Sequence, residues 1–170
     1  FIENGIRGAM IYSIYDNTSI KIAKDLILKG KIIIYPTDTI YGFGVDATNC
    51  NAINILNKVK KRTQVYSIIV NSIEMIKTYA NLTDKEEKSL KKYLPGPYNI
   101  IIKKNNNNLS KLISLDLTTI GIRMPKHNFC LNLVNEIKHP IVTTSVNEHG
   151  AIPLNNINNI SKKFPNINIF

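Results

Sequence analysis

The sequence predicts a single α/β domain, on two observations that extend along most of the chain. Short runs rich in β-branched and aromatic residues predict strands at residues 31–35, 66–70, 98–104, 118–123 and 140–144. Apolar residues at helical spacing predict helices at residues 17–29, 51–61, 72–79, 83–93, 127–138 and 155–164. Because strands and helices alternate, the pattern is typical of α/β proteins.

Residues with special backbone preferences mark several boundaries of these elements. Gly30 stands where the first helix would need a C-terminal cap. Thr83 and Glu86 form a capping-box pattern, and the Leu-Pro-Gly-Pro segment at 94–97 must end the helix that they begin. Pro36 ends the first strand, after which the sequence predicts a polar loop through residue 42.

Length and composition suit one globular domain with its own core. The chain has 170 residues, of which 44% are hydrophobic, and no apolar run approaches the roughly 18 residues of a membrane span. We expect residues 10–170 to form this domain, with Met10 as a candidate start and residues 1–9 as a leader or remnant. The distant pair Cys50 and Cys130 fits no metal-binding spacing and predicts reduced thiols in a cytoplasmic protein.

The formal net charge of +10 fits either an RNA-, nucleotide- or membrane-binding face or an ordinary solvated lysine-rich surface. Of the 22 basic residues only three are arginines: Arg7, Arg62 and Arg123. A guanidinium can hold a carboxylate or phosphate through two parallel hydrogen bonds, which lysine cannot do. Arginines that persist in such a lysine-rich chain are therefore candidate anion ligands.

Four polar segments stand out as candidate binding segments: residues 35–44 (YPTDTIYGFG), 60–62 (KKR), 119–125 (TIGIRMP) and 143–147 (TTSVN). Each also has an ordinary structural explanation. The first could be a turn capped by Asp38, and the cations of the second could stabilise a helix C-terminus. Arg123 could be a solvated strand end, and residues 143–147 could form an Asx or Ser turn.

Other catalytic patterns do not occur in the sequence. There is no Walker A loop and no GxGxxG motif. The three histidines share no pattern with an acid or a cysteine, so we expect surface positions and no metal site for His127, His139 and His149.

Taken together, the four segments resemble the YrdC/TsaC-like threonylcarbamoyl-AMP synthase family. The family signature is Y-P-T-D-T-x-Y-G, K-x-R, P-G-P, T-x-x-x-R-x-P and S-x-N in that order. All five motifs occur here, at residues 35–42, 60–62, 95–97, 119–125 and 145–147. The match extends from about Gly30 to Pro153, which is most of the chain.

The resemblance implies a twisted α/β fold with a deep, basic, concave site for ATP and an amino acid. The residues that it assigns to the nucleotide are Lys60, Arg62, Thr119, Ser145 and Asn147. Of these, Lys60 and Arg62 are expected to act in catalysis by offsetting negative charge. The residues that it assigns to the other substrates are Thr37, Tyr41, Arg123 and Thr143. Thr37 would contact threonine and Arg123 would lie near its carboxylate.

The activity that the resemblance implies is synthesis of threonylcarbamoyl-AMP and pyrophosphate from L-threonine, bicarbonate and ATP. A magnesium ion that bridges the phosphates is expected with ATP. The product would pass to a tRNA-modifying transferase complex, direct contact with tRNA is conceivable, and no membrane is involved. The cytoplasm is the expected compartment.

Some positions depart from the family pattern. The loop after Arg62 is short, Asn71 stands where many members have a histidine, and Pro153 stands where a small hydroxyl residue is common. The chain ends at Phe170, before a stretch in which many members supply another arginine to ATP. Two alternatives therefore stay open: a non-catalytic RNA-binding module in tRNA or ribosome maturation, and a relative that binds nucleotide without turnover.

Overall fold

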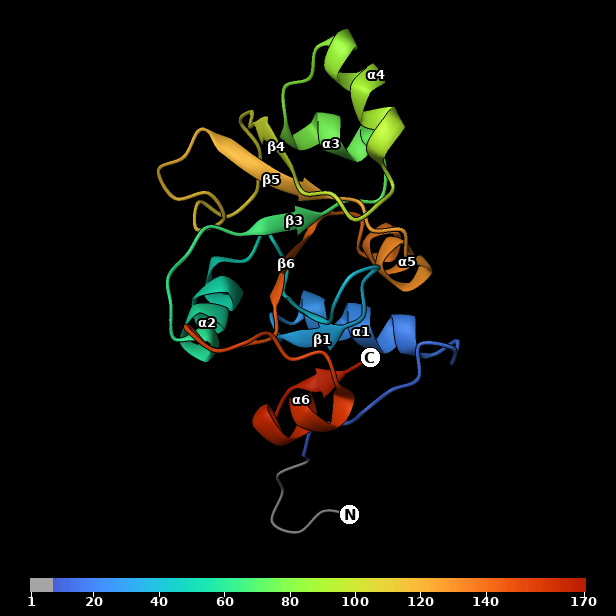
Figure 1. Ribbon diagram of the computed structural model, residues 1–170, viewed down its shortest axis with the longest axis vertical. Helices are drawn as coiled ribbons and strands as arrows, with labels where there is room; N and C mark the ends of the chain where they lie inside the picture. Colours follow the sequence, from blue (N-terminus) through green and yellow to red (C-terminus); the bar gives the residue numbers. More distant parts are fainter. Residues whose placement is uncertain (1–7) are drawn as a thin grey trace.

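The computed structural model describes residues 8–170, so Arg7 and most of the expected leader lie outside the described residues. Within that range, seven strands form one mixed sheet in the order β4-β5-β3-β6-β2-β1-β7 (Figure 1). The strands are β1 (Ile33–Tyr35), β2 (Gly42–Gly44), β3 (Ser67–Ile69), β4 (Ile100–Lys103), β5 (Thr119–Arg123), β6 (Ile141–Ser145) and β7 (Asn168–Ile169). The pairs β3–β5 and β1–β7 are parallel, and the other neighbours are antiparallel.

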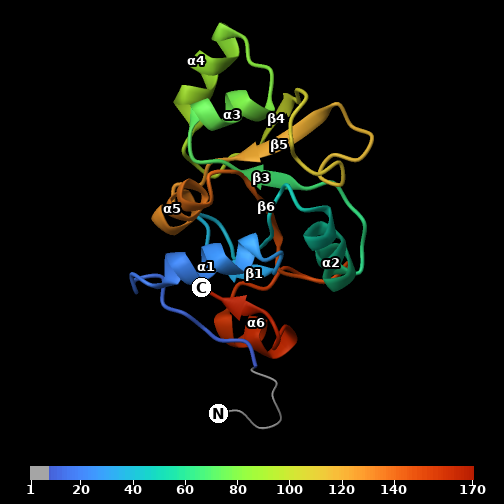
Figure 2. The same ribbon diagram turned by 180° about the vertical axis from the view of Figure 1, so that it is seen from behind.

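Helices cover the sheet unevenly. They are α1 (Ser19–Leu28), α2 (Cys50–Lys60), α3 (Ile73–Tyr79), α4 (Asp84–Tyr93), α5 (Asn128–Ile137) and α6 (Ile157–Lys163). In both views α3 and α4 stand together at the β4 end of the molecule and α6 lies at the opposite end (Figures 1 and 2). No helix within residues 8–170 combines the length and apolar character needed to cross a membrane.

Alternating residues of the strands build two separate cores. One core contains Ile34, Phe43, Ile68, Ile122 and Val142 on one face of the sheet. The other core contains strand residues of the opposite face, packed against α1 and α5: Ile33, Tyr35, Ile69 and Ile141. Because both faces bury apolar side chains, the central strands are apolar on both sides.

The α1/α5 face changes character along β3 and β6. Ile69 and Ile141 are buried there, but the next residues on the same face are Ser67 and Thr143. Side chains two residues apart on a strand share a face. The apolar, helix-covered part of this face therefore gives way to a polar part, and the candidate site is built on that part.

The α/β fold and the helices are confirmed, but two strands were not predicted. Residues 42–44 form β2, so the predicted loop stops short of Gly42. A Gly-Phe-Gly segment has weak β propensity, and tertiary pairing with β1 and β6 decides its structure. Glycine is needed here because a Cβ at Gly44 would lie 2.6 Å from Cε1 of the Tyr35 ring. The short C-terminal strand β7 had no sequence signal of its own.

Candidate functional site

The polar part of the α1/α5 face forms a cleft of about 450 Å³, called the central cleft below. Three of the four candidate segments, all but 60–62, contribute to its lining, which also includes residues from outside them. The lining residues are Thr39, Ile40, Tyr41, Gly42, Ser67, Pro97, Asn99, Arg123, Thr143, Thr144 and Ser145. Segments more than 100 residues apart in sequence thus meet at one site, as the prediction of a shared site requires.

The sheet register gives the cleft a centre and two ends. Ser67 of β3 pairs with Gly121 of β5 on one side and with Thr143 of β6 on the other. β3 is parallel to β5 and antiparallel to β6. A step of two residues toward the C-terminus of β5 therefore points in the opposite direction to the same step along β6. On β5 the step leads to Arg123, and on β6 it leads to Ser145. Arg123 and Ser145 therefore mark opposite ends of the cleft.

The Ser145 end is built around a buried lysine, and we call it the Lys60 end. Lys60 is only 3% exposed. Its Nζ donates to the carbonyl of Ser145 at 2.6 Å and to Oδ1 of Asn147 at 3.2 Å. The Ser145 hydroxyl donates to the same Oδ1 at 2.5 Å. The structure thus brings together the K-x-R lysine and both polar residues of S-x-N.

Burial and the nearby Arg62 guanidinium lower the pKa of Lys60 from 10.5 to about 8. Desolvation is the larger cause, because burial penalises the charged ammonium. None of the ion pairs formed within residues 8–170 includes Lys60. Its charge contacts only neutral groups, namely these oxygens and the ring of Phe43, whose centroid lies 5.8 Å away, so a bound anion would stabilise it.

The loop after β6 is pinned to the end of α2, which fixes the Lys60 end. The amide of His149 donates to the carbonyl of Lys60 at 2.7 Å. Glu148, in the same loop, forms the second link through ion pairs with Lys61 at 3.1 Å and with Lys163 of α6 at 3.5 Å. These cations and their hydrogen bonds lower the pKa of Glu148. Lys61 itself ends α2 in the left-handed conformation, which turns the chain away after Lys60.

Four of the residues predicted to bind the nucleotide lie outside the lining of the central cleft: Lys60, Asn147, Arg62 and Thr119. Lys60 and Asn147 are linked to it through Ser145. Arg62 is exposed and borders a separate hollow at the end of α2 with Asn57 and Lys61. Thr119 begins β5 on the same face as Gly121, four residues before Arg123 and so displaced toward the Lys60 end. Both could contact a ligand that extends beyond the cleft.

At the opposite end, Arg123 is held by the loop after β1. Its Nη2 lies 3.3 Å from Oδ1 of Asp38 and donates to the hydroxyl of Thr39 at 3.0 Å. The other carboxylate oxygen of Asp38 accepts from the backbone amide of Lys126 at 3.0 Å. Asp38 thus orients the guanidinium and neutralises its charge, and we call this the Arg123 end.

The remaining predicted residues differ in how they reach the cleft. Thr37 is absent from the lining; its hydroxyl donates to the carbonyl of Ile40 at 2.6 Å and so shapes the loop. Thr143 is 6% exposed on the cleft floor. Tyr41 lines the cleft, its amide donates to Oδ1 of Asn155 at 3.0 Å, and partial burial raises the pKa of its phenol.

Sequence reasoning missed two polar residues of the cleft, Ser67 and Asn99, and assigned no role to Thr144 of the segment 143–147. Thr144 accepts a hydrogen bond from Nε2 of Gln64 at 3.2 Å, which ties the loop after α2 to β6. Ser67 donates to Oδ1 of Asn99 at 2.9 Å. The signal in the sequence was Ser67 itself, a single polar residue within the otherwise apolar strand at residues 66–70. Such a residue can indicate which face of a strand lines a site.

Asn71, noted for replacing a histidine, is not in the lining. Its amide donates to Oδ1 of Asn135 on α5 at 3.3 Å. The prediction of a surface residue is wrong for His127, which is half-buried with a fully buried Nδ1. Burial lowers the pKa of this imidazole.

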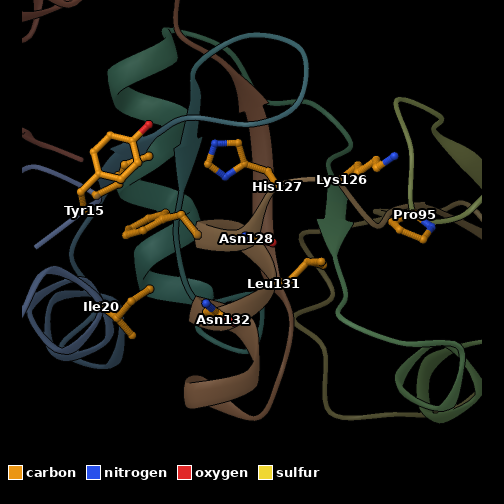
Figure 3. Close-up of a pocket in the computed structure, with 10 residues that line it drawn as sticks. Tyr15, Ile20, Pro95, Lys126, His127, Asn128, Leu131 and Asn132 are labelled. Carbon is orange, nitrogen blue, oxygen red and sulfur yellow. The ribbon is translucent and has the colours of Figure 1, made fainter. Parts of the chain in front are cut away.

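A larger hollow of about 630 Å³ lies next to His127, between α5 and the segment before α1 (Figure 3). Tyr15, Ile20, Pro95 and Lys126 line it as well, with the first turns of α5. Pro95 is the one motif residue in its lining, and none of the residues to which the motifs assign a ligand lines it. The central cleft is smaller, but it joins the motif residues and has cations near both ends, so we take it as the functional site.

The arrangement can bind two anionic groups at a fixed separation. The Lys60 end has a cation without a carboxylate partner, beside a Ser145 hydroxyl and an Asn147 amide that donate within the protein. The Arg123 end offers an oriented guanidinium. The hydroxyls of Thr143 and Ser67 lie on the floor between them. Such a site positions reactants and offsets charge, and its lining supplies no nucleophilic cysteine.

The chain is similar in sequence to several known proteins. A model of the Sua5/YciO/YrdC domain, described as "Telomere recombination", matches residues 25–170. The threonylcarbamoyl-AMP synthase of Pyrococcus abyssi is 29% identical over 148 residues, which are 85% of this chain and 43% of that protein. The threonylcarbamoyl-AMP synthase of Hydrogenovibrio crunogenus is 30% identical over 153 residues, which are 86% of this chain and 82% of that protein.

A solved structure gives the same result for the fold. The structure of P. abyssi Sua5 complexed with L-threonine is 26% identical in sequence and superposes with a TM-score of 0.84. The superposition covers 95% of this chain and 48% of that chain. The chain spans about half the length of the first curated relatives that it matches.

Proposed function

This chain belongs to the Sua5/YciO/YrdC family, and on that premise we propose that it is a nucleotidyltransferase that makes threonylcarbamoyl-AMP. Its substrates are L-threonine, bicarbonate and ATP, and its second product is pyrophosphate. The observation that carries the proposal is the central cleft, which has an oriented arginine at one end and Ser145 at the other, where the Ser145 carbonyl accepts from the buried Lys60. Lys60 has no carboxylate partner within residues 8–170. The relatives named above as threonylcarbamoyl-AMP synthases support it.

The reaction is balanced without a covalent enzyme intermediate. The amine of threonine and bicarbonate give a carbamate and water. A carbamate oxygen then forms a bond to the α-phosphorus of ATP, the bond from that phosphorus to the α,β-bridging oxygen breaks, and pyrophosphate leaves with the electron pair. The protein must bring two anions together and keep water away from an unstable carbamate.

The Lys60 end suits the nucleotide. The triphosphate brings several negative charges, and Lys60 is a cation whose charge is uncompensated by the protein. Ser145 and Asn147 add a hydroxyl and an amide beside it. The exposed Arg62 and the start of β5 at Thr119 would meet parts of the nucleotide beyond the cleft. Charge-assisted hydrogen bonds are the strongest that these residues can offer a phosphate.

The Arg123 end suits the amino acid. Asp38 and Thr39 occupy one side of Nη2, which leaves the rest of the guanidinium free for the flat α-carboxylate of threonine. Thr143 lies on the floor of the cleft toward the centre, where the amino acid would extend. Thr37 would act through the shape of the loop, because its hydroxyl is used inside it. The solved structure of P. abyssi Sua5 is a complex with L-threonine, which supports this class of substrate.

Magnesium is expected to arrive with ATP and to be held by the phosphates. Asp38, the carboxylate of the first motif, already binds Arg123 and the amide of Lys126, so it does not fit a role as metal ligand. The product would pass to a tRNA-modifying transferase complex. Both thiols are unpaired, with Cys130 donating to the carbonyl of Pro36, which fits the reducing cytoplasm as the proposed compartment.

The test is a turnover assay on the purified chain. With ATP, magnesium, bicarbonate and L-threonine we expect release of pyrophosphate and a product with the mass of threonylcarbamoyl-AMP. Omission of threonine should abolish both signals, and serine in its place should lower them. Nucleotide binding without turnover would indicate a relative that has lost catalysis, and RNA binding with neither would indicate a non-catalytic module; either result contradicts the proposal.

A further inference from the structure

We propose that Asn99 contacts the reacting group itself, by donating a hydrogen bond from its side-chain amide to an oxygen of the carbamate or the α-phosphate. Ser67 is the positioning residue that holds this amide in place. The inference rests on the proposed function and adds a residue that none of the family motifs includes. Three observations carry it: the orientation of Asn99, the space made for it, and its place between the two ends of the cleft.

The hydrogen bond between the two side chains orients the amide. The Ser67 hydroxyl donates to Oδ1 of Asn99 at 2.9 Å, so the carbonyl side of the amide faces β3. Nδ2 is on the other side of the same planar group, and no hydrogen bond within residues 8–170 uses it as donor. Asn99 therefore offers two N–H groups to a ligand in the central cleft, which it lines.

A glycine makes room for this pair. A Cβ at Gly121 would lie 2.5 Å from the hydroxyl oxygen of Ser67 and 3.0 Å from Oδ1 of Asn99. Gly121 has an ordinary strand conformation on β5, so glycine is needed here for space and not for an unusual backbone conformation. Any larger residue at position 121 would displace the pair from the cleft floor.

The position of the pair is the third observation. Ser67 shares a row of the sheet with Gly121 and Thr143. Arg123 lies two residues from this row toward one end, and Ser145 lies two residues from it toward the other. Ile100 pairs with Ile122, so the backbone of Asn99 lies level with Arg123 and its side chain reaches back to Ser67 in the central row. Two residues of strand span about 7 Å, so the contact between the two side chains lies near the centre of the cleft floor, between Arg123 and Ser145. The bond between carbamate oxygen and α-phosphorus must form in this centre.

The chemistry of the amide fits that place. Negative charge gathers on the carbamate and on the non-bridging oxygens of the α-phosphate as the two anions approach. A neutral N–H donor stabilises this charge without competing for the phosphates that Lys60 binds. Removal of one pre-oriented donor to developing charge typically lowers kcat by about 100-fold or more.

The experiment measures turnover and binding in Asn99→Ala with the exposed Asn108→Ala as matched control, since both remove a surface amide. For Asn99→Ala we expect kcat to fall by about 100-fold, with the separate affinities for ATP and threonine changed by less than about threefold. Asn108→Ala should behave as the unchanged protein. Thermal unfolding of both variants should match that of the unchanged protein, because Asn99 is exposed and outside the core.

Ser67→Ala and the double variant test the positioning role. Loss of the serine hydroxyl should lower kcat by about tenfold without a change in the KM for threonine, since the amide is still present but less well oriented. The double variant should be no slower than Asn99→Ala alone, because Ser67 acts only through Asn99. Additive losses would overturn this role.

The outcomes separate this inference from the proposed function. If the unchanged protein turns over and Asn99→Ala turns over equally well, the inference is wrong and the function stands. If Asn99→Ala loses ATP or threonine affinity in proportion to turnover, the residue binds a ground-state substrate and the assignment to the reacting group is wrong. If the unchanged protein shows no threonine-dependent turnover, the function and the inference fail together.

Discussion

The two ends of the central cleft hold their cations in opposite ways. At one end, Lys60 is 3% exposed and binds only neutral oxygens, those of Ser145 and Asn147. At the other end, the side chain of Arg123 is 17% exposed and forms an ion pair with Asp38 at 3.3 Å. One cation is buried without compensation, and the other is more accessible and neutralised.

This difference indicates which anion each end is suited to bind. A buried charge without a counter-ion is unfavourable, so the Lys60 end gains most from a ligand with high negative charge. A neutralised guanidinium gains little from charge alone and contributes mainly through the geometry of its hydrogen bonds. The contrast predicts a polyphosphate at Lys60 and a single flat carboxylate at Arg123.

The largest expected effect follows from removal of the buried charge. Lys60→Met keeps the length of the side chain but not its cation, and we expect ATP affinity to fall by about 100-fold, or roughly 2–3 kcal/mol. Lys58→Met is the matched control, because Lys58 is exposed in the same last turn of α2. Calorimetric titration with ATP measures both. Equal ATP affinities in the two variants would show that the buried position of Lys60 gives it no special role in binding ATP.

A pH titration sharpens the same contrast with an effect of about tenfold. The pKa of Lys60 is lowered to about 8, so its ammonium is charged below that pH and neutral above it. ATP is fully ionised above about pH 7, because the second pKa of a phosphate is about 6. ATP affinity should therefore fall by about tenfold between roughly pH 7 and pH 9. In Lys60→Met the profile over this range should be flat, and a slope that persists there would assign the effect to another group.

A smaller effect is expected on stability at the Arg123 end. Asp38→Asn removes the charge that compensates Arg123 in a largely buried pair, and we expect a loss of about 1 kcal/mol in the free energy of unfolding. Asp25→Asn, at an exposed position of α1, should change it by less than about 0.5 kcal/mol. Urea unfolding of the two variants provides the measurement. Equal stabilities would mean that Asp38 contributes orientation only.

The two cations also differ in how well the sequence alone predicts their role. Arg123 was recognisable because arginine is scarce in a lysine-rich chain and ends an apolar strand. Lys60 could be assigned only through its motif, since its burial depends on the loop after β6, which folds back from residue 145 onto α2. Helical spacing does place Lys60 on the apolar face of α2 with Ile53 and Leu56, but that position alone does not assign it to an anion.

The fold shows the same limit. Long helices and apolar strands were predicted from periodicity, whereas β2 needed pairing partners on both sides to form. The cleft floor depends on register: Ser67 matters because Gly121 and Thr143 lie beside it, and register is a tertiary property. Sequence therefore supplied the motif residues, and their separation into two ends required the structure.

The central claim is that the cleft binds nucleotide at Lys60 and amino acid at Arg123, and a crossed titration tests it most directly. Lys60→Met and Arg123→Lys are each titrated with ATP and, separately, with threonine. We expect Lys60→Met to lose ATP affinity and keep threonine, and Arg123→Lys to lose about tenfold in threonine affinity and keep ATP, because lysine preserves charge but not the paired hydrogen bonds. If Arg123→Lys instead loses ATP and keeps threonine, the division of the cleft is wrong.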